Sequence, residues 1–231
     1  YITRTLGTNV ENITLIDNPG TPIAANATGN LLNNIIDGSQ HSLGNTLTGD
    51  TGNDNYIVGA GDDVLEAASE GTDTVQSSVA WSLDSNIEIL TLSGTGSVNG
   101  TGNSLANTIT GNSGANTLSG GGGDDLLRGG DGLDTMWGDA AADTFVFDAA
   151  TAFNNIDLVK DFSTAQNDKI DIRDLLSGYD PLTEVLTDFF EITTSVSNSI
   201  LKVDMDGTCG AYSLTQIATL EAITSLTNEA A

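Results

Sequence analysis

The sequence has little of what usually stabilises a small protein. Its 231 residues include 6 Lys and Arg against 32 Asp and Glu, which gives a net charge of -26 at pH 7. A single Cys, Cys209, excludes an internal disulfide, and aromatic residues make up only 5% of the chain. Nucleic acid and anionic membranes are poor candidates as partners, because both would repel this charge. Divalent cations are the partners that the composition favours.

Long apolar runs are also missing. No stretch approaches the about 20 apolar residues of a membrane-spanning helix, so we expect no direct membrane insertion. The sequence opens at Tyr1 without Met or a basic, apolar leader, and we expect a fragment that carries no N-terminal export signal. Apolar residues at 38% and only 3 Pro argue against a disordered chain. We therefore expect a folded, monomeric protein.

Glycine is abundant and recurs at fixed positions. From Gly102 to Val146 the chain divides into five nine-residue units: GNSLANTIT, GNSGANTLS, GGGGDDLLR, GGDGLDTMW and GDAAADTFV. Each fits the pattern G-G-x-G-x-D-x-U-x, in which U is a large apolar residue, although the first two have Asn in place of Asp. Three more units precede them: GDTGNDNYI at 49–57, VGAGDDVLE at 58–66 and ASEGTDTVQ at 68–76.

The spacing of the U residues predicts the fold. A glycine turn followed by a three-residue strand points only U inward, because neighbouring strand side chains face opposite sides. Two such units complete one coil of a flattened solenoid. We therefore predict a parallel β-solenoid over residues 1–147, irregular in 1–48 and 77–101. The expected inward residues are Tyr56, Leu65, Val75, Leu83, Leu92, Ile109, Leu118, Leu127, Met136 and Phe145.

Such a coil buries too little to fold without help. One inward side chain contributes about 2 kcal/mol, whereas ordering nine residues costs on the order of 10 kcal/mol. Calcium can supply the difference, because it accepts six to eight oxygen ligands in flexible geometry and a glycine turn exposes its carbonyl oxygens. The sequence therefore predicts several bound Ca²⁺ ions.

Turns two units apart stack on the same edge of such a solenoid, and this predicts which side chains share an ion. Asp125 should meet Asn107 and Asp143. The other expected pairs are Asp134 with Asn116, Asp54 with Asp73, and Asp63 with Asn45. The candidate metal ligands are the side chains of Asp54, Asp63, Asp73, Asn107, Asn116, Asp125, Asp134 and Asp143, with turn residues Gly120, Gly122, Gly129, Asp131 and Gly138 contributing carbonyls.

These units closely resemble the RTX calcium-binding repeats of proteins that bacteria secrete by the type I pathway. Two consecutive full units, GGGGDDLLR and GGDGLDTMW, make the resemblance specific. It implies a mainly β protein with a right-handed parallel β-roll, and it gives the acidic ligand role to the Asp residues of the pattern. Val58, Ala68 and Ala141 stand at glycine positions, where the turn must tolerate a Cβ.

The remainder of the chain resembles the C-terminal target region of type I secreted proteins, especially large adhesins. We expect residues 148–231 to form a β-rich cap with one or two short helices. NNIDLVKDF and NDKIDIRDLL alternate like half-buried strands, and Leu214, Ile217, Leu220 and Ile223 have helix-like spacing. His41, in the polar segment SQHS, is expected to be solvated. Two interpretations stay open, calcium binding or the exposed face of strands, for Asp157, Asp161, Asp168 and Asp171.

The sequence favours a non-catalytic, calcium-binding C-terminal module of a type I secreted extracellular protein. It would be unfolded at low calcium, pass through the secretion channel tail first and fold outside the cell, in solution or at the cell surface. An enzyme is disfavoured because a single His leaves no paired zinc ligand and no G-x-S-x-G segment occurs. The alternatives are a surface adhesion or ligand-binding module, and a calcium-dependent accessory domain of a secreted hydrolase.

Overall fold

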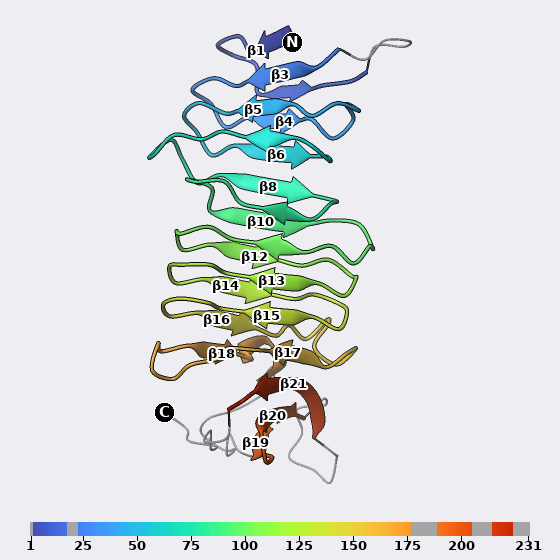
Figure 1. Cartoon of the computed structure of the whole chain (residues 1–231), viewed down its shortest axis with the longest axis vertical. Coiled ribbons are helices and arrows are strands. Elements are labelled where there is room, and N and C mark those ends of the chain that lie inside the picture. The colour runs from blue at the N-terminus through green and yellow to red at the C-terminus, as the bar shows by residue number, and fades with distance from the viewer. Residues whose placement is uncertain (1, 18–22, 177–188, 205–213, 224–231) are drawn as a thin grey trace.

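Short strands follow the glycine turns and stack into a long parallel ladder (Figure 1). The computed structural model describes residues 2–17, 23–176, 189–204 and 214–223. One face of the ladder is a nine-stranded parallel sheet. Its strands, in spatial order, are β2 (Asn12–Thr14), β4 (Ile35–Asp37), β6 (Asn55–Val58), β8 (Thr74–Ser77), β10 (Ile89–Leu92), β12 (Thr108–Thr110), β14 (Leu126–Arg128), β16 (Thr144–Val146) and β18 (Lys169–Asp171).

The opposite face is divided into two sheets. The first contains β1 (Ile2–Thr5), β3 (Ala25–Thr28), β5 (Thr46–Thr48) and β7 (Asp63–Val64). The second begins with β9 (Trp81–Ser82), β11 (Gly100–Thr101), β13 (Thr117–Ser119), β15 (Thr135–Trp137) and β17 (Asp157–Val159), and it ends with β21 (Thr215–Glu221), β20 (Asn198–Val203) and β19 (Phe190–Thr194). The prediction of a mainly β chain built as a parallel solenoid is confirmed.

The register shows where the repeat is regular. Thr108 pairs with Leu126, and Leu126 pairs with Thr144, so each coil there takes 18 residues, or two units. Before this array the coils vary, since Thr74 pairs with Ile89, only 15 residues on. After it, Thr144 pairs with Lys169, so the parallel strands continue past residue 147.

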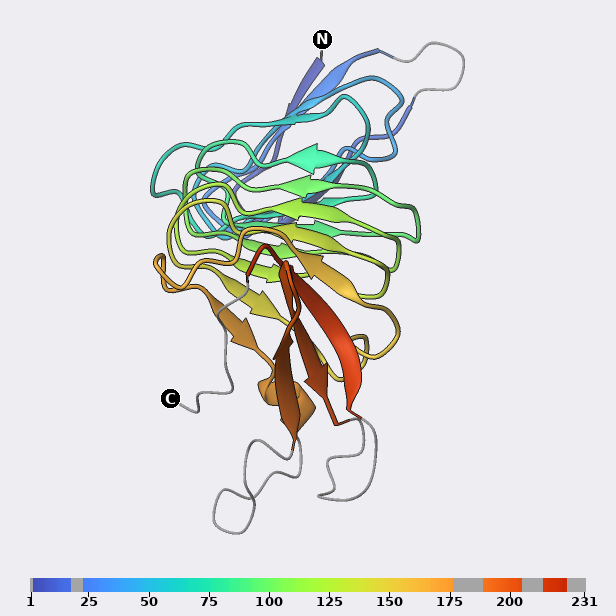
Figure 2. The ribbon, with the colours of Figure 1, turned by 60° about the horizontal axis from the view of Figure 1, so that its bottom comes forward.

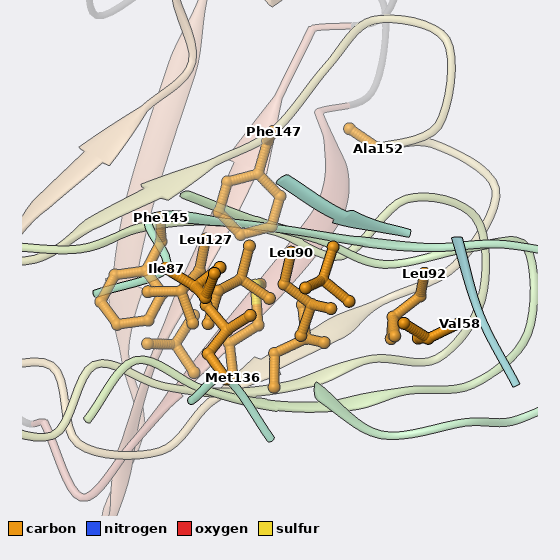
Figure 3. Close-up of a cluster of buried hydrophobic side chains, with 14 of the residues drawn as sticks. Val58, Ile87, Leu90, Leu92, Leu127, Met136, Phe145, Phe147 and Ala152 are labelled. Carbon is orange, nitrogen blue, oxygen red and sulfur yellow. The ribbon is translucent and has the colours of Figure 1, made fainter. Parts of the chain in front are cut away.

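The core is a continuous cluster of apolar side chains between the two faces (Figure 3). Nine of the ten expected inward residues are buried, among them Ile109, Leu118, Leu127, Met136 and Phe145, each with no exposed surface. Leu65 was predicted wrongly, because it is 51% exposed and Val64 is fully buried in its place. Leu47 pairs with Val64 and fixes this register. The unit is one residue short, which shifts its side chains to the opposite faces.

The last strands close the solenoid (Figure 2). β21 pairs parallel with β17 and antiparallel with β20, which pairs with β19. The helix predicted from the spacing of Leu214 to Ile223 is therefore wrong. Ile217 and Leu220 are buried as strand residues, because the open edge of β17 offers hydrogen bonds that local propensity does not foresee. Cys209 lies outside the described residues.

The predicted strands in NNIDLVKDF and NDKIDIRDLL are confirmed as β17 and β18. Helical structure among the described residues is limited to one 3-10 turn, at Arg173–Leu176. None of the helical segments described is long or apolar enough to cross a membrane.

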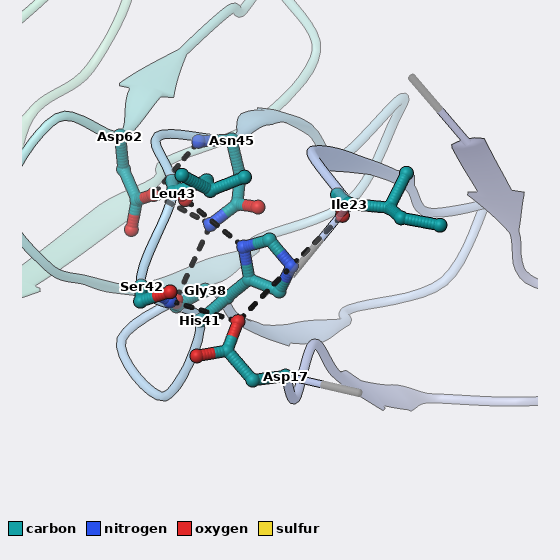
Figure 4. A network of polar contacts seen from close by, with 8 residues as sticks. All are labelled: Asp17, Ile23, Gly38, His41, Ser42, Leu43, Asn45 and Asp62. Atoms are coloured by element: carbon teal, nitrogen blue, oxygen red, sulfur yellow. Dashed lines mark hydrogen bonds and ion pairs between the residues drawn. The ribbon is translucent and has the colours of Figure 1, made fainter. Parts of the chain in front are cut away.

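His41 departs from the expectation that it is solvated. The residue is 7% exposed, and its Nδ1 and Nε2 atoms lie 3.0 Å from the carbonyl oxygen of Leu43 and 3.1 Å from that of Ile23 (Figure 4). Asp17 Oδ1 lies 3.5 Å from Nε2. The polar insertion folds back against the solenoid. The imidazole ring of His41 therefore lies between loops instead of facing water.

Candidate metal-binding turns

Side chains at the aspartate position of successive units form hydrogen-bonded rows along the two edges of the solenoid. In one row, each residue directly precedes a strand of the nine-stranded sheet, and we call this row the first aspartate ladder. In it, Asp125 Oδ1 accepts a hydrogen bond from the backbone N–H of Asn107 at 2.7 Å, and Asp143 Oδ1 accepts one from Asp125 at 2.9 Å. Asp73 Oδ1 accepts from the N–H of Asp54 at 2.7 Å. These predicted neighbours are therefore brought together.

The row on the opposite edge, the second aspartate ladder, has the same geometry. Asp134 Oδ1 accepts from the N–H of Asn116 at 2.8 Å. Asn45 does not meet Asp63 as expected. Asp62 Oδ1 accepts instead from the Asn45 N–H at 2.9 Å and from Nδ2 at 2.6 Å (Figure 4). Asp63 is exposed and belongs to β7. The short unit that exposes Leu65 thus also moves the aspartate position by one residue.

Only one oxygen of each ladder carboxylate is used by these bonds. The other oxygen, Oδ2, is buried without a hydrogen-bond partner in Asp54, Asp125, Asp134 and Asp143. A buried polar atom without a partner costs on the order of 1 to 3 kcal/mol, and more when it carries charge. A hard cation held at the turn would remove that cost, because it would coordinate these oxygens. The turns therefore fit the metal that the sequence predicts.

The first glycine of each unit makes room for these oxygens. A Cβ at Gly120, Gly129 or Gly138 would overlap the Oδ2 atom of the aspartate five residues later in the same unit. At Gly102 it would overlap the carbonyl oxygen of Gly120 on the next coil. Carboxylate and carbonyl oxygens thus converge beneath the glycine turns, which is the arrangement a calcium site requires.

Two of the predicted turn residues, Gly122 and Asp131, lack this close contact with ladder oxygens. A Cβ at Gly122 would meet nothing closer than 3.7 Å, so glycine is not required there by space. The carboxylate of Asp131 lies at the surface and accepts a hydrogen bond from the Asn154 side chain. Their carbonyls stay predicted ligands.

Burial raises the pKa of four ladder carboxyls, those of Asp73, Asp125, Asp134 and Asp143. It is the largest cause of a pKa of about 7 for Asp125 and of about 6 for Asp73, Asp134 and Asp143. Hydrogen bonds from the preceding coil oppose the increase, and neighbouring carboxylates of the same ladder reinforce it at Asp73, Asp125 and Asp143. Protons therefore compete with a metal for these oxygens near neutral pH.

Both ladders continue past the last repeat. Asp157 Oδ1 accepts from the N–H of Asp134 at 3.0 Å, and Asp168 Oδ1 accepts from that of Asp143 at 3.0 Å. Both residues are buried, so the interpretation of these two as exposed strand residues is wrong. The Asp161 carboxylate accepts hydrogen bonds from the N–H groups of Gly138 and Asp139. Asp171 instead pairs with Arg173 at the surface.

Sequence reasoning missed two residues in this region. Asp62 could have been found, because Asp62 and Val64 keep the D-x-U spacing when the unit starts one residue earlier. Glu66 carries no signal, since it takes the place of a first glycine, opposite Gly49, only in the shifted register of the structure. It accepts a hydrogen bond from the N–H of Gly49 at 3.1 Å. Burial, followed by the nearby Asp73 carboxylate, raises its pKa to about 8.

Comparison with known families agrees with this geometry. The family described as RTX calcium-binding nonapeptide repeat (4 copies) matches residues 44–65, 101–136 and 119–149. The matched residues are RTX-type repeats, and the parallel solenoid that they form fits an RTX β-roll. The RTX matches cover the regular array and the first pair of units before it, and they imply that these repeats bind calcium. No curated protein matches the chain.

Proposed function

We propose that this RTX domain is a non-catalytic folding switch, unfolded at low calcium and folded by several calcium ions outside the cell. The observation that carries the proposal is that the Oδ2 atoms of Asp54, Asp125 and Asp143 in the first ladder, and of Asp134 in the second, are buried without partners. An apolar core of one side chain per unit leaves these charges uncompensated. The ions would lie between the Oδ2 atoms and the glycine-turn carbonyls.

The charge distribution explains why the chain cannot replace the ions itself. No Lys or Arg occurs between Arg4 and Arg128, a stretch that contains most of both aspartate ladders. A cation that binds the folded state and not the unfolded one stabilises the folded state by mass action. Affinities of about 10⁻⁴ to 10⁻³ M, typical of extracellular modules, would place the switch between calcium levels inside and outside a cell.

A calcium titration of the whole chain tests this proposal. Far-ultraviolet circular dichroism should show little β-structure in chelator, and millimolar calcium should restore the β signal cooperatively. Magnesium should substitute poorly, because it requires tighter octahedral geometry and releases its water reluctantly. The same β signal in chelator and in calcium would contradict the proposal.

We also propose that residues 148–231 direct export through a type I channel. Support comes from the resemblance of residues 145–231 to type I target regions. Deleting residues 156–231 should abolish export of a fused passenger without altering the folding of that passenger. Unchanged export would place the signal elsewhere.

The non-catalytic part of the proposal is supported by the use of the ladder carboxylates, which bind backbone N–H groups of adjacent coils. An RTX β-roll is a structural calcium-binding fold. Hydrolysis of ester, peptide or glycosidic model substrates by the purified chain would contradict this part.

A further inference from the structure

Three carboxylates meet where the coil of β5 and β6 stacks on that of β7 and β8. Ligand oxygens of Asp54, Glu66 and Asp73 all lie within 4.8 Å of one another. Oxygens on opposite sides of a calcium ion are at most about 5 Å apart, because each Ca–O distance is about 2.3 to 2.6 Å. The spacing therefore allows all three carboxylates to bind one ion. Among the residues that the structure describes, no other group of three acidic, His or Cys side chains is this close.

Buried oxygens without partners point into the same place. Asp54 is 1% exposed, and its Oδ2 has no hydrogen-bond partner. Tyr56 is fully buried, and its phenol oxygen also has no partner. A Cβ on Gly49 would overlap both of these atoms, so they border one point beneath the Gly49 turn. Glu66 lies against the same turn through its bond to the Gly49 N–H, and its Oε2 is buried without a partner.

This place differs from a repeat turn in its chemistry. In the regular array, the N–H of the first glycine donates to a backbone carbonyl of the next coil, as from Gly102 to Ser119 and from Gly120 to Trp137. At Gly49 the acceptor is the Glu66 side chain, which adds a third carboxyl group to the Asp54 and Asp73 pair. Asp161 takes the equivalent place beneath Gly138, but both of its oxygens accept backbone hydrogen bonds. Of these two side chains, Glu66 is the one that keeps a carboxylate oxygen without a hydrogen-bond partner.

We propose that Asp54, Glu66 and Asp73 form a three-carboxylate calcium site, bordered by Tyr56, that binds calcium more tightly than the repeat turns. The inference rests on the proposed calcium binding and adds a ligand that the repeat pattern does not contain. Calcium affinity rises with the number of charged ligands. The repeat turns offer two carboxylates, as at Asp125 and Asp143, or one with an Asn. The three-carboxylate site should therefore fill first and hold the two coils together.

Isothermal titration of the whole chain with calcium tests the site. Glu66→Gln should weaken the tightest class of binding at least about tenfold, or remove one ion from it, while the weaker class keeps its affinity. Asp63→Asn is the matched control, because Asp63 is an exposed acid three residues away in the same coil. It removes the same charge and should leave both classes unchanged.

The outcomes separate this inference from the proposed function. Absence of calcium binding by the native chain would overturn both. Normal binding in the native chain with identical isotherms for Glu66→Gln would overturn the three-carboxylate site alone. Equal losses of calcium affinity in Glu66→Gln and Asp63→Asn would also overturn it, because they would indicate a general effect of charge.

Terbium luminescence gives a second measurement that does not depend on the folding of the Glu66 variant. Terbium replaces calcium at oxygen sites and emits when a nearby tyrosine is excited. The first ion bound to the native chain should show tyrosine-sensitised emission, and Tyr56→Phe should remove most of it at equal terbium occupancy. Unchanged emission from the first ion would overturn the assignment.

Discussion

The regular array of residues 102–146 and the coils before it differ in coil length and in the groups that accept the N–H of the first glycine. In the array every coil takes 18 residues, and backbone carbonyls accept the N–H groups of Gly102, Gly111 and Gly120. In the earlier coils the unit that contains Val64 is one residue short, and the Glu66 carboxylate accepts the N–H of Gly49. A change of one residue thus converts a backbone contact into a charged side-chain contact.

The two regions also differ in how many apolar residues a strand can bury. In the array, strands such as β12 and β14 place one residue inward. In the earlier part, β6 buries both Tyr56 and Val58. The strand β10 buries both Leu90 and Leu92 (Figure 3). The array should therefore depend more on calcium, and the earlier coils more on their core.

The largest expected effect separates specific stacking from simple acidity within the array. Asp125→Ala should raise the calcium concentration at half-folding at least about tenfold, because Asp125 lies between Asn107 and Asp143 in the first ladder. Asp131→Ala removes the same charge from a surface position and should change the midpoint less than about twofold. Circular dichroism titrations measure both midpoints. Equal shifts would show that the acids act as a diffuse counterion layer.

The next effect tests the shifted register of the earlier coils. In saturating calcium, Val64→Ala should lower the free energy of unfolding by about 2 kcal/mol, because it leaves a cavity in the core. Leu65→Ala, at a 51% exposed site, should change it by less than about 0.5 kcal/mol. Urea unfolding compares the two variants. A larger loss for Leu65→Ala would restore the nine-residue register predicted from the pattern.

A smaller effect should appear when the pH is changed. The folded pKa of about 7 for Asp125 and about 6 for Asp134 and Asp143 exceeds the unfolded value of about 4. The folded state thus binds more protons than the unfolded state in this range. Without calcium, these carboxyls therefore contribute stability that is fully present near pH 4 and is lost as the pH rises through 6 to 7.

In chelator, the β signal should therefore increase from pH 8 to pH 5. With calcium the dependence reverses, because protons and calcium compete, and the calcium midpoint should rise several-fold over the same range. Circular dichroism at fixed ionic strength measures both. A calcium midpoint that does not change with pH would place the ions away from the ladder carboxylates.

The smallest expected effect is at a turn where the array departs from glycine. Ala141 has a φ of 95°, in the region that favours glycine, and Gly123 and Gly132 hold the equivalent places at 90° and 123°. Ala141→Gly should raise the unfolding free energy by about 1 kcal/mol, because it removes the Cβ strain. Ala140→Gly is the control and should lower it slightly. Thermal unfolding in calcium distinguishes the two.

The sequence predicted most where its period is regular. Ile109, Leu127 and Phe145 lie inward as expected, because each coil of the array repeats the last. It failed at Val64, since the match to a fixed nine-residue unit gave no reason to delete a position. It failed at Ile217 and Leu220, whose helix-like spacing predicted a helix, because this segment instead pairs as a strand with the free edge of β17. Glu66 could not be found, because only the three-dimensional offset between coils places it beside Asp73.

The ladder hydrogen bonds all run in one direction along the chain. Asn107 donates to Asp125, Asp125 to Asp143, and Asp143 to Asp168, so the acceptor is always on the coil nearer the C-terminus. A formed coil therefore offers a ready carboxylate to the coil upstream of it, whereas it needs its downstream neighbour to satisfy its own N–H. Asp168 also accepts locally, from the N–H of Ser163 at 2.7 Å. The stack thus has a built-in polarity, and assembly that starts at Asp168 can proceed toward the N-terminus with each new N–H satisfied on arrival.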